Sequence, residues 1–393
     1  MSTPAVTPQD GGVGQNWTAA LVAILVILVL VLIGVSYFFV RFLVPAGLPQ
    51  QTATAGGMTW VRSIYGYGPS AGEQLLGPTA VAVAPNGTIY ATDPQRARVL
   101  AFNPDGTFRG PIQSGAGGAA KGQIGRPADV AVDADGFIYI SDFKNGKVLV
   151  FDDRFAFVRE WKVPLALGIT VTDETVYVRS GGEVIQYGLD GIEKSRAGKR
   201  GRGTGAAIEP AGGITADAER IYVADALNRS IKAFDPAGSL LWVTPKNPSE
   251  TSSSVEATAP ITEGSSVLLD LPQDVVLDAA GRLVAVDAFN FSVLVMNATS
   301  GAIENSFGQE GTGDGQFVYP SGLAYDAKRD WFVVADTSNN RLQIVRIEGS
   351  GGGGGQAASR ALSSPFRVCV VPLAALLAAL AILFATRRRT TAS

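Results

Sequence analysis

Short apolar runs separated by tight polar turns occupy most of the chain, and this pattern predicts β-strands. The pattern is clearest in residues 126–161, with runs at 129–132, 137–140, 148–151 and 157–161. The first turn, Asp133-Ala134-Asp135-Gly136, contains the glycine that a tight hairpin needs. The two middle runs are apolar at nearly every position, which is typical of strands buried on both faces. We therefore expect this four-stranded unit to pack between other sheets.

The four-stranded unit recurs along the chain. Each copy opens with a proline, and an aspartate follows fifteen residues later in four copies. In the last copy the spacing is sixteen residues, and in the third copy Ser180 replaces the aspartate. The six prolines are Pro78, Pro127, Pro164, Pro210, Pro272 and Pro320, at intervals of 49, 37, 46, 62 and 48 residues. An all-β repeat near this length predicts a six-bladed β-propeller.

Three copies share a longer motif. Each copy matches a different part of it. The matching residues are Val130-Ala131-Val132-Asp133 in the second copy, Ile221-Tyr222-Val223-Ala224-Asp225 with Asn228 and Arg229 in the fourth, and Ala335-Asp336 with Asn339 and Arg341 in the sixth. This motif resembles NHL repeats, over roughly residues 58 to 348. The resemblance implies a propeller of the NHL type. It implies no particular activity, because propellers carry many unrelated functions.

The two ends of the predicted propeller domain, residues 58–348, are expected to join. Residues 58–65 form a strand-like run before the first full repeat, and the sixth repeat ends after only three strands. We expect residues 58–65 to supply the outer strand of the last blade, which closes the ring and removes open sheet edges. The third repeat lacks both the aspartate and a clear hairpin, so we expect it to form the most irregular blade.

Two uncharged apolar segments, residues 19–40 and 368–386, flank the propeller, and each is long enough to cross a bilayer as a transmembrane α-helix. The predicted parts outside the propeller are a polar tail (1–17), a transmembrane helix (18–44), a linker (45–57), a glycine-rich tether (349–365), a second transmembrane helix (366–386) and a basic tail (387–393). The alternative for the first helix is a cleavable signal peptide. The alternatives for the second are a buried helix or a cleavable C-terminal sorting signal.

Charges next to the two segments predict their orientation. Arg387, Arg388 and Arg389 follow the second segment, whereas Arg41 alone follows the first. Because cytoplasmic flanks are enriched in lysine and arginine, three charges against one favour a cytoplasmic C-terminus. With two spans, both termini are expected in the cytoplasm and the propeller outside it, at the cell membrane.

Composition narrows the chemistry. The chain has no histidine and a single cysteine, Cys369, which rules out histidine catalysis, histidine metal ligands and an intrachain disulfide. We find no nucleophile elbow and no phosphate-binding loop, so no catalytic residue and no organic cofactor are predicted. Residues 57–349 contain 26 basic and 34 acidic residues, a net charge of −8, which argues against nucleic acid as a partner.

The candidate metal ligands are Asp129 and Asp274. Both lie two residues after a repeat proline, where the innermost strands should open onto the central channel. Carboxylate and backbone oxygens suit calcium, although Ala80 and Gly212 occupy the corresponding positions of two other blades. The alternative is that both aspartates cap turns and remain solvated. The Asp-x-x-Asn pairs of four blades are interpreted as structural, because a repeated pair holds a repeated turn.

The sequence favours a non-enzymatic, membrane-tethered scaffold that binds a protein or an envelope polymer. Two long inter-blade loops would carry the contacts. Their predicted binding residues are Lys199, Arg200, Arg202, Glu250, Glu256 and Glu263. The alternative is a histidine-free hydrolase or lyase that uses carboxylates at the channel mouth, with or without calcium. An enzyme should show three or more converging carboxylates or amides there, and a scaffold only scattered polar groups.

Overall fold

The computed structural model describes residues 57–112, 118–202, 207–209, 211–245 and 269–351, with residues 25, 28, 29, 53, 54 and 205. The predicted helix at 366–386 and both tails lie outside these residues, as does the predicted helix at 18–44 apart from residues 25, 28 and 29. Within the described part of the chain, no helix is both long enough and apolar enough to cross a bilayer.

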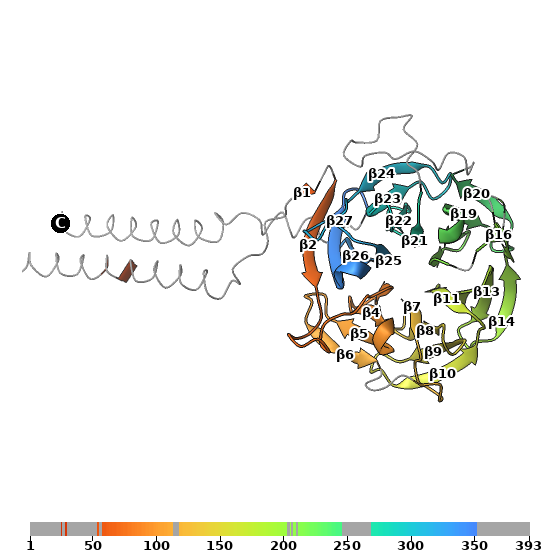
Figure 1. Ribbon diagram of the computed structural model, residues 1–393, viewed down its shortest axis with the longest axis horizontal. Helices are drawn as coiled ribbons and strands as arrows, with labels where there is room; N and C mark the ends of the chain where they lie inside the picture. Colours follow the sequence, from red (N-terminus) through yellow and green to blue (C-terminus); the bar gives the residue numbers. More distant parts are fainter. Residues whose placement is uncertain are drawn as a thin grey trace, which may run out of the picture. The chain divides into compact units, whose positions relative to one another are not determined.

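The described strands form six blades around a central axis, and together they make a β-propeller (Figure 1). Blade 1 contains β3 (Val81–Val83), β4 (Ile89–Asp93), β5 (Arg98–Phe102) and β6 (Phe108–Ile112). Blade 2 contains β7 (Pro127–Val132), β8 (Ile138–Asp142), β9 (Lys147–Phe151) and β10 (Phe157–Lys162). Blade 3 contains β11 (Ala166–Val171), β12 (Thr175–Ser180), β13 (Glu183–Gly188) and β14 (Glu193–Ala197).

The remaining blades follow the same order from the axis outward. Blade 4 contains β17 (Ile214–Ala216), β18 (Ile221–Asp225), β19 (Ser230–Phe234) and β20 (Leu240–Thr244). Blade 5 contains β21 (Pro272–Leu277), β22 (Leu283–Asp287), β23 (Ser292–Met296) and β24 (Ile303–Phe307). Blade 6 contains β25 (Pro320–Asp326), β26 (Trp331–Asp336), β27 (Arg341–Ile347), β2 (Met58–Ile64) and β1 (Ala53–Thr54).

Short elements occupy the connections. The 3-10 turns η1 (Pro94–Arg96), η2 (Ala226–Asn228) and η4 (Thr337–Asn339) join the second and third strands of blades 1, 4 and 6. A parallel pair, β15 (Lys199–Arg200) and β16 (Ala207–Ile208), lies in the link between blades 3 and 4. We call the face where the innermost strands begin the upper face, and the face where they end the lower face.

Burial follows the predicted pattern. Every residue of β8, β9, β22 and β23 is buried, whereas the outer strand β10 is half-exposed or exposed throughout. The middle strands are covered on both sides by neighbouring blades, which explains why they are apolar at nearly every position. Exposed residues are frequent in the outer strands, where one side of the blade meets water.

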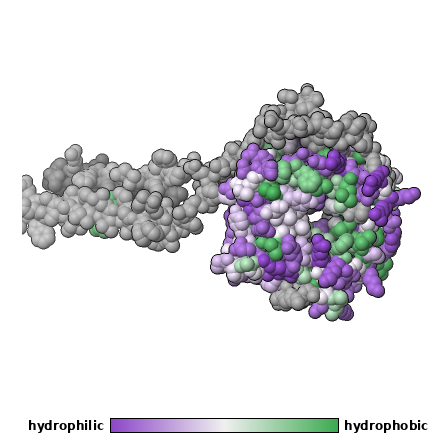
Figure 2. All heavy atoms as spheres, in the orientation of Figure 1, coloured by the Kyte–Doolittle hydropathy of each residue, from purple (hydrophilic) through white to green (hydrophobic). Residues whose placement is uncertain are grey.

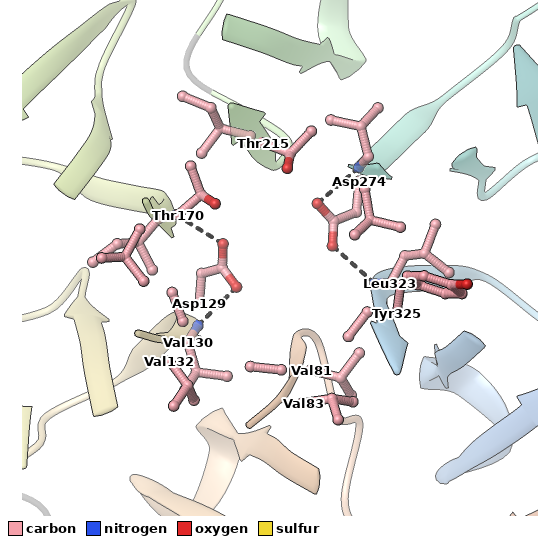
Figure 3. Close-up of a pocket in the computed structure, with 18 residues that line it drawn as sticks. Val81, Val83, Asp129, Val130, Val132, Thr170, Thr215, Asp274, Leu323 and Tyr325 are labelled. Carbon is pink, nitrogen blue, oxygen red and sulfur yellow. Dashed lines mark hydrogen bonds between the residues drawn. The ribbon is translucent and has the colours of Figure 1, made fainter. Parts of the chain in front are cut away.

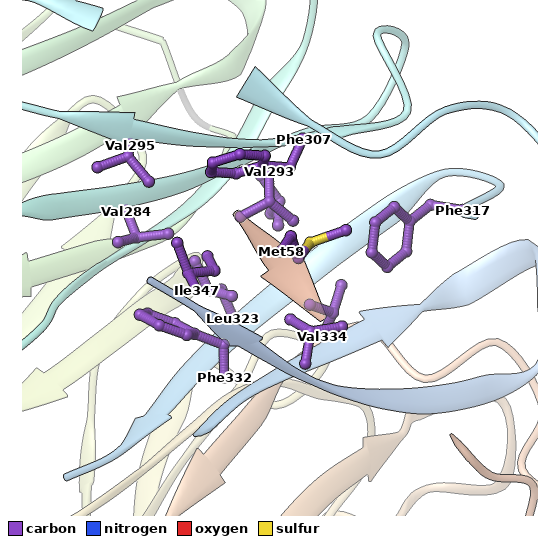
Figure 4. Close-up of a cluster of buried hydrophobic side chains, with 12 residues drawn as sticks. Met58, Val284, Val293, Val295, Phe307, Phe317, Leu323, Phe332, Val334 and Ile347 are labelled. Atoms are coloured by element: carbon purple, nitrogen blue, oxygen red, sulfur yellow. The ribbon is translucent and has the colours of Figure 1, made fainter. Parts of the chain in front are cut away.

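Apolar side chains of adjacent blades pack together to form the core. Between blades 5 and 6, Met58 packs in one cluster with Val293 and Phe307 of blade 5 and with Phe332 and Ile347 of blade 6 (Figure 4). Met58 is 1% exposed. Burying a side chain of this size stabilises the fold by about 1.5–3 kcal/mol. Strand β2 therefore contributes both to the sheet of blade 6 and to the core.

The expected closing strand is confirmed. Strand β2 pairs antiparallel with β27, with Met58 opposite Ile347 and Ile64 opposite Leu342. The pairing joins the first and last parts of the propeller into one sheet. It also covers the outer edge of β27, which would otherwise offer unpaired backbone groups.

A buried aspartate at the end of the second strand ties the incoming link to its blade. Asp142 accepts hydrogen bonds from the backbone N–H groups of Gly125 and Arg126, at 2.7 and 2.9 Å, and from Nδ2 of Asn145 at 2.7 Å. Equivalent bonds to a link and to an asparagine are made by Asp225, Asp287 and Asp336. The prediction that the Asp-x-x-Asn pairs are structural is confirmed.

The third blade is complete, so the prediction that it would be the most irregular is wrong. Its strands contain six, six, six and five residues. Ala166 pairs with Ser180 as Pro127 pairs with Asp142, so Ala166, and not Pro164, occupies the position of the repeat proline. The fully buried Arg179 replaces the missing aspartate as a connection to the next link. Its guanidinium donates to the carbonyls of Glu209, Ala211, Gly212 and Ala224.

The packed chain extends slightly beyond the predicted end of the domain. Ser350 is fully buried, and its hydroxyl donates to the carbonyl of Ile347. Its own carbonyl accepts the N–H of Ala280, in a turn at the lower face. The predicted tether at 349–365 therefore begins with residues that are held against the propeller, because the small Ser350 fits between blades 5 and 6.

We expect the Asp142→Ala variant to lower the free energy of unfolding by about 2–4 kcal/mol, because it leaves buried N–H groups without an acceptor. Chemical denaturation followed by tryptophan fluorescence measures the change. The control is Asp153→Ala, in an exposed lower-face turn, which should shift stability by less than about 0.5 kcal/mol. Equal effects of the two substitutions would contradict the role given to Asp142.

Candidate functional site

Two cavities follow the axis of the propeller, with volumes of about 180 and 220 Å³. The lower one is lined by the innermost strands of all six blades, including residues such as Val132 and Tyr325. The upper one is lined by residues just before or at the start of these strands, including Gln273 and Ser321. Among the residues that the structure describes, Asp129 and Asp274 alone line both cavities. The predicted pair therefore marks the point where the upper and lower parts of the channel meet.

Each carboxylate connects two blades. Asp129 of β7 accepts the N–H of its neighbour Val130 at 2.7 Å and that of Ile169 in blade 3 at 2.8 Å. Asp274 of β21 makes the same pair of bonds, to Val275 at 2.9 Å and to Leu323 in blade 6 at 2.8 Å. Figure 3 shows the two carboxylates on opposite sides of the channel, pointing toward each other. Both were predicted as channel residues, and the structure brings them together.

Close backbone contact explains why the other blades have no carboxylate here. The strand register places Ala80, Gly168, Gly213 and Gly322 at the equivalent positions. Gly213, and not the predicted Gly212, is equivalent to Asp129, because Ile214 pairs with Val223 as Val130 pairs with Ile140. A Cβ atom on Gly213 would lie 1.9 Å from Oδ1 of Asp274. A larger residue at that position would displace the carboxylate.

The environment of the pair favours protonation. Burial raises the pKa of Asp129 to about 7, although two backbone N–H groups act in the opposite direction. Burial and the charge of Asp129 raise the pKa of Asp274 well above its ordinary value. The lining of both cavities, as far as the structure describes it, contains no lysine or arginine that would favour the charged forms. The alternative prediction, that these aspartates cap turns and remain solvated, stays a prediction, because Asp274 is buried whereas Asp129 is only half-buried.

The donor set is small for a calcium ion. Calcium usually takes about six to eight oxygen ligands, and all four oxygens of this pair already accept a backbone N–H group. Among the described residues, no group of three or more His, Cys, Asp or Glu side chains is placed to hold a metal ion. The pair alone does not fit the ion, and a calcium site stays a prediction.

The predicted binding loops are described only in part. Lys199 and Arg200 form β15 and are exposed, and Arg202 is also exposed, with its Nε 3.7 Å from Oε1 of Glu209. Backbone atoms of Arg200 lie against the Gly182 turn at the upper face, where a Cβ on Gly182 would be 2.3 Å from Cα of Arg200. The structure therefore places Arg200 at the upper face. The other predicted residues, Glu250, Glu256 and Glu263, lie outside the described residues.

Exposed apolar side chains on the upper face were not predicted. Phe143, Leu227 and Phe289 lie in turns between second and third strands, and Leu165 lies just before β11. Their exposed fractions are 38%, 60%, 51% and 50%, in the same order. Figure 2 shows apolar residues among polar ones around the central opening on one face. A sequence signal existed, because three of these residues follow the repeat aspartate by one or two positions.

The raised pKa values predict that the channel pair destabilises the fold as pH rises. The contribution of Asp129 is complete below its unfolded pKa of 3.8 and is lost as pH passes through its folded pKa of about 7. Between about pH 5 and pH 8, the urea midpoint of the wild type should fall more steeply than that of the Asp129→Asn, Asp274→Asn double variant. The control replaces the exposed Asp135 and Asp153 by asparagine, which should keep the wild-type slope. Parallel slopes for the wild type and the channel variant would contradict the assignment.

Comparison with known proteins supports the repeat and the fold. The family model described as NHL repeat matches residues 125–151 and 317–345, in blades 2 and 6. A segment of 43 residues is 51% identical to the protein brain tumor of Drosophila melanogaster, which is 11% of this chain and only 4% of that protein. This short match carries no information about the activity of the whole chain.

Solved structures share the propeller fold. A protein of unknown function from Bacteroides thetaiotaomicron matches with a TM-score of 0.57 and 15% identity, over 74% of this chain and 76% of its own. An auxiliary nutrient binding protein from the same organism matches with a TM-score of 0.54 and 13% identity, over 75% and 77%. Virginiamycin B lyase from Staphylococcus aureus matches with a TM-score of 0.48 and 11% identity, over 73% and 98%, a score too low to establish a shared fold. The chain is thus a six-bladed β-propeller with NHL repeats in at least two of its blades.

Proposed function

We propose that this chain is a membrane-tethered, non-enzymatic scaffold at the cell membrane, whose extracytoplasmic propeller binds a protein or an envelope polymer. The observation that carries the proposal is the set of exposed apolar side chains on the upper face, Phe143, Leu165, Leu227 and Phe289. Burying exposed apolar surface against a partner is favourable, because it removes that surface from water. The rigid blades hold these side chains in place, so binding loses little conformational entropy.

The path of the chain supports the same arrangement. The N–H of Glu348 donates to the carbonyl of Gly57, so the two ends of the described propeller lie together. Ser350 is held by Ala280 and Tyr325, both at the lower face. In this proposal the tethers leave at the lower face, and the upper face is available to a partner.

A histidine-free hydrolase or lyase is the second candidate. The pKa of Asp129, raised to about 7, favours it, because such a carboxyl group can act as a general acid near neutral pH. With Gln273, the upper cavity contains two carboxylates and one amide, the smallest set expected of an enzyme. These groups are occupied, however: each carboxylate oxygen accepts a backbone N–H, and the amide lies 3.5 Å from the hydroxyl of Tyr319. We therefore favour the scaffold.

Protease added to intact cells tests the topology. Tags at either terminus should survive while the propeller is cleaved, because Arg387–Arg389 retain the C-terminus in the cytoplasm and two spans return the chain to the same side. Immunoblotting measures the tags, and permeabilised cells provide the control in which both are digested. Digestion of either tag in intact cells would show that the proposed orientation is incorrect.

Deletion of residues 250–263 tests the contribution of the long loop. The propeller should stay folded, because this segment has few apolar residues, and fewer partners should be recovered by cross-linking and affinity capture. Asp129→Asn is the control, since it alters only the channel and should retain the partners. If the deletion variant recovers the same partners as the wild type, the loop is not part of the binding surface. If the control loses partners, the channel contributes to binding.

A further inference from the structure

We propose that a basic and apolar strip on the upper face of blades 2 to 4 docks an extended acidic protein segment that also carries apolar side chains. The strip consists of Arg126, Phe143, Lys144, Leu165, Arg200 and Leu227. This inference rests on the proposed binding function and adds the chemistry of the partner. It also differs from the predicted loop patch, because only Arg200 belongs to both.

The strip is continuous across three blades. In blade 2, the N–H of Phe143 donates to the carbonyl of Arg126, and the turn that follows is joined to the next link by the bond from Val163 to Gly146. Leu165 in that link reaches blade 3, with Cδ1 3.7 Å from the position of a Cβ on Gly181. These contacts connect Arg126 and Phe143 to Leu165.

The same surface continues into blade 4. Arg200 lies against Gly182, the second residue of the turn that Leu165 reaches. The next residue, Gly201, accepts a hydrogen bond from Nδ2 of Asn228 at 3.1 Å. Asn228 adjoins Leu227 in η2, so backbone contacts connect the turns that carry the strip from blade 3 to blade 4.

The strip has the opposite charge to the propeller as a whole. Arg126, Lys144 and Arg200 are exposed, and none of the three forms an ion pair within the described residues. The turns at the lower face, in contrast, contain thirteen acidic and five basic side chains. Acidic residues therefore gather at one face, and uncompensated cations interleave with apolar side chains at the other.

Charge complementarity selects an acidic partner. A negatively charged segment is attracted to the strip, and its apolar side chains would cover Phe143, Leu165 and Leu227. A bilayer is less suitable, because the propeller's own ends are at the lower face, beside Ser350 and Ala280. Nucleic acid is also disfavoured, because the net charge of −8 repels a long polyanion, whereas a short acidic segment contacts only the basic strip.

The test uses the full chain in detergent and a fluorescein-labelled peptide in which glutamates alternate with leucine and phenylalanine. Fluorescence anisotropy should show saturable binding that weakens as salt is added, because exposed charges are screened. The competing probes are a single-stranded RNA oligonucleotide, vesicles of anionic phospholipid, and the same peptide with glutamine in place of glutamate. The acidic peptide should bind most tightly.

Two triple variants and matched controls locate the binding. Arg126→Glu, Lys144→Glu, Arg200→Glu should weaken peptide binding at least about tenfold by charge reversal. Phe143→Ala, Leu165→Ala, Leu227→Ala should weaken it about tenfold through lost apolar contact. The controls make the same changes in exposed lower-face residues, as Arg154→Glu with Lys328→Glu and as Ile192→Ala, and should bind like the wild type. Circular dichroism and melting curves confirm that each variant is folded.

Several results would overturn the docking proposal. They are no binding of the acidic peptide, wild-type affinity in both triple variants, equal losses in the lower-face controls, or tighter binding of RNA or vesicles through the same residues. Cross-linking in native membranes separates this failure from failure of the proposed function. If the triple variants recover the same partners as the wild type, the strip is wrong and the scaffold stands. If the wild type recovers none, the scaffold itself is wrong.

Discussion

Six sheets converge on one axis in this propeller, and the space between their innermost strands limits what each can carry there. Glycine is required at Gly213 and Gly322, where an added Cβ would lie 1.9 Å from Oδ1 of Asp274 and 2.6 Å from Cα of Ala80. Asp129 and Asp274 occupy the remaining space on opposite sides. Their carboxylates accept hydrogen bonds from the adjacent blades and lie where the upper and lower cavities meet. The limited space at the axis thus determines both the packing of the innermost strands and the protonation of Asp129 and Asp274.

Links between blades are held by buried polar groups at the rim of the upper face. Four blades use an aspartate that accepts N–H groups from the incoming link, as Asp142 does. Blade 3 uses a cation for the same purpose, and Arg179 donates to carbonyls of the following link. Both solutions satisfy backbone groups that water cannot reach. The exposed Phe143 and Leu227 lie in the turns that follow these second strands, and Leu165 lies in the link before β11.

The two faces of the disc differ in what they offer a partner. Lower-face turns are strongly acidic, and Gly57 and Ser350, near the two ends of the described propeller, lie beside them. The upper face combines exposed apolar side chains with cations that have no counterion in the described residues. In the proposed function this difference would leave the lower face for attachment and the upper face for recognition.

The sequence alone determined the repeated part of the molecule. Six blades were indicated by the apolar runs and by the spacing of proline and aspartate, because both are local patterns that repeat. Ring closure was indicated by the strand at 58–65. It also identified Asp129 and Asp274 as channel residues. Their burial, bonding to neighbouring blades and raised pKa depended on tertiary structure, because these arise only when innermost strands from separate repeats meet.

Register and surface continuity were likewise decided by the tertiary structure. By sequence spacing, Pro164 is the repeat proline of blade 3 and Gly212 is the counterpart of Asp129 in blade 4. Shorter hairpins in these blades shift the two positions to Ala166 and Gly213. The proposed upper-face strip joins residues of three consecutive repeats that lie far apart in the sequence, from Arg126 to Leu227. A local pattern cannot show which side chains share a face after six sheets have been arranged around an axis, because that depends on long-range packing.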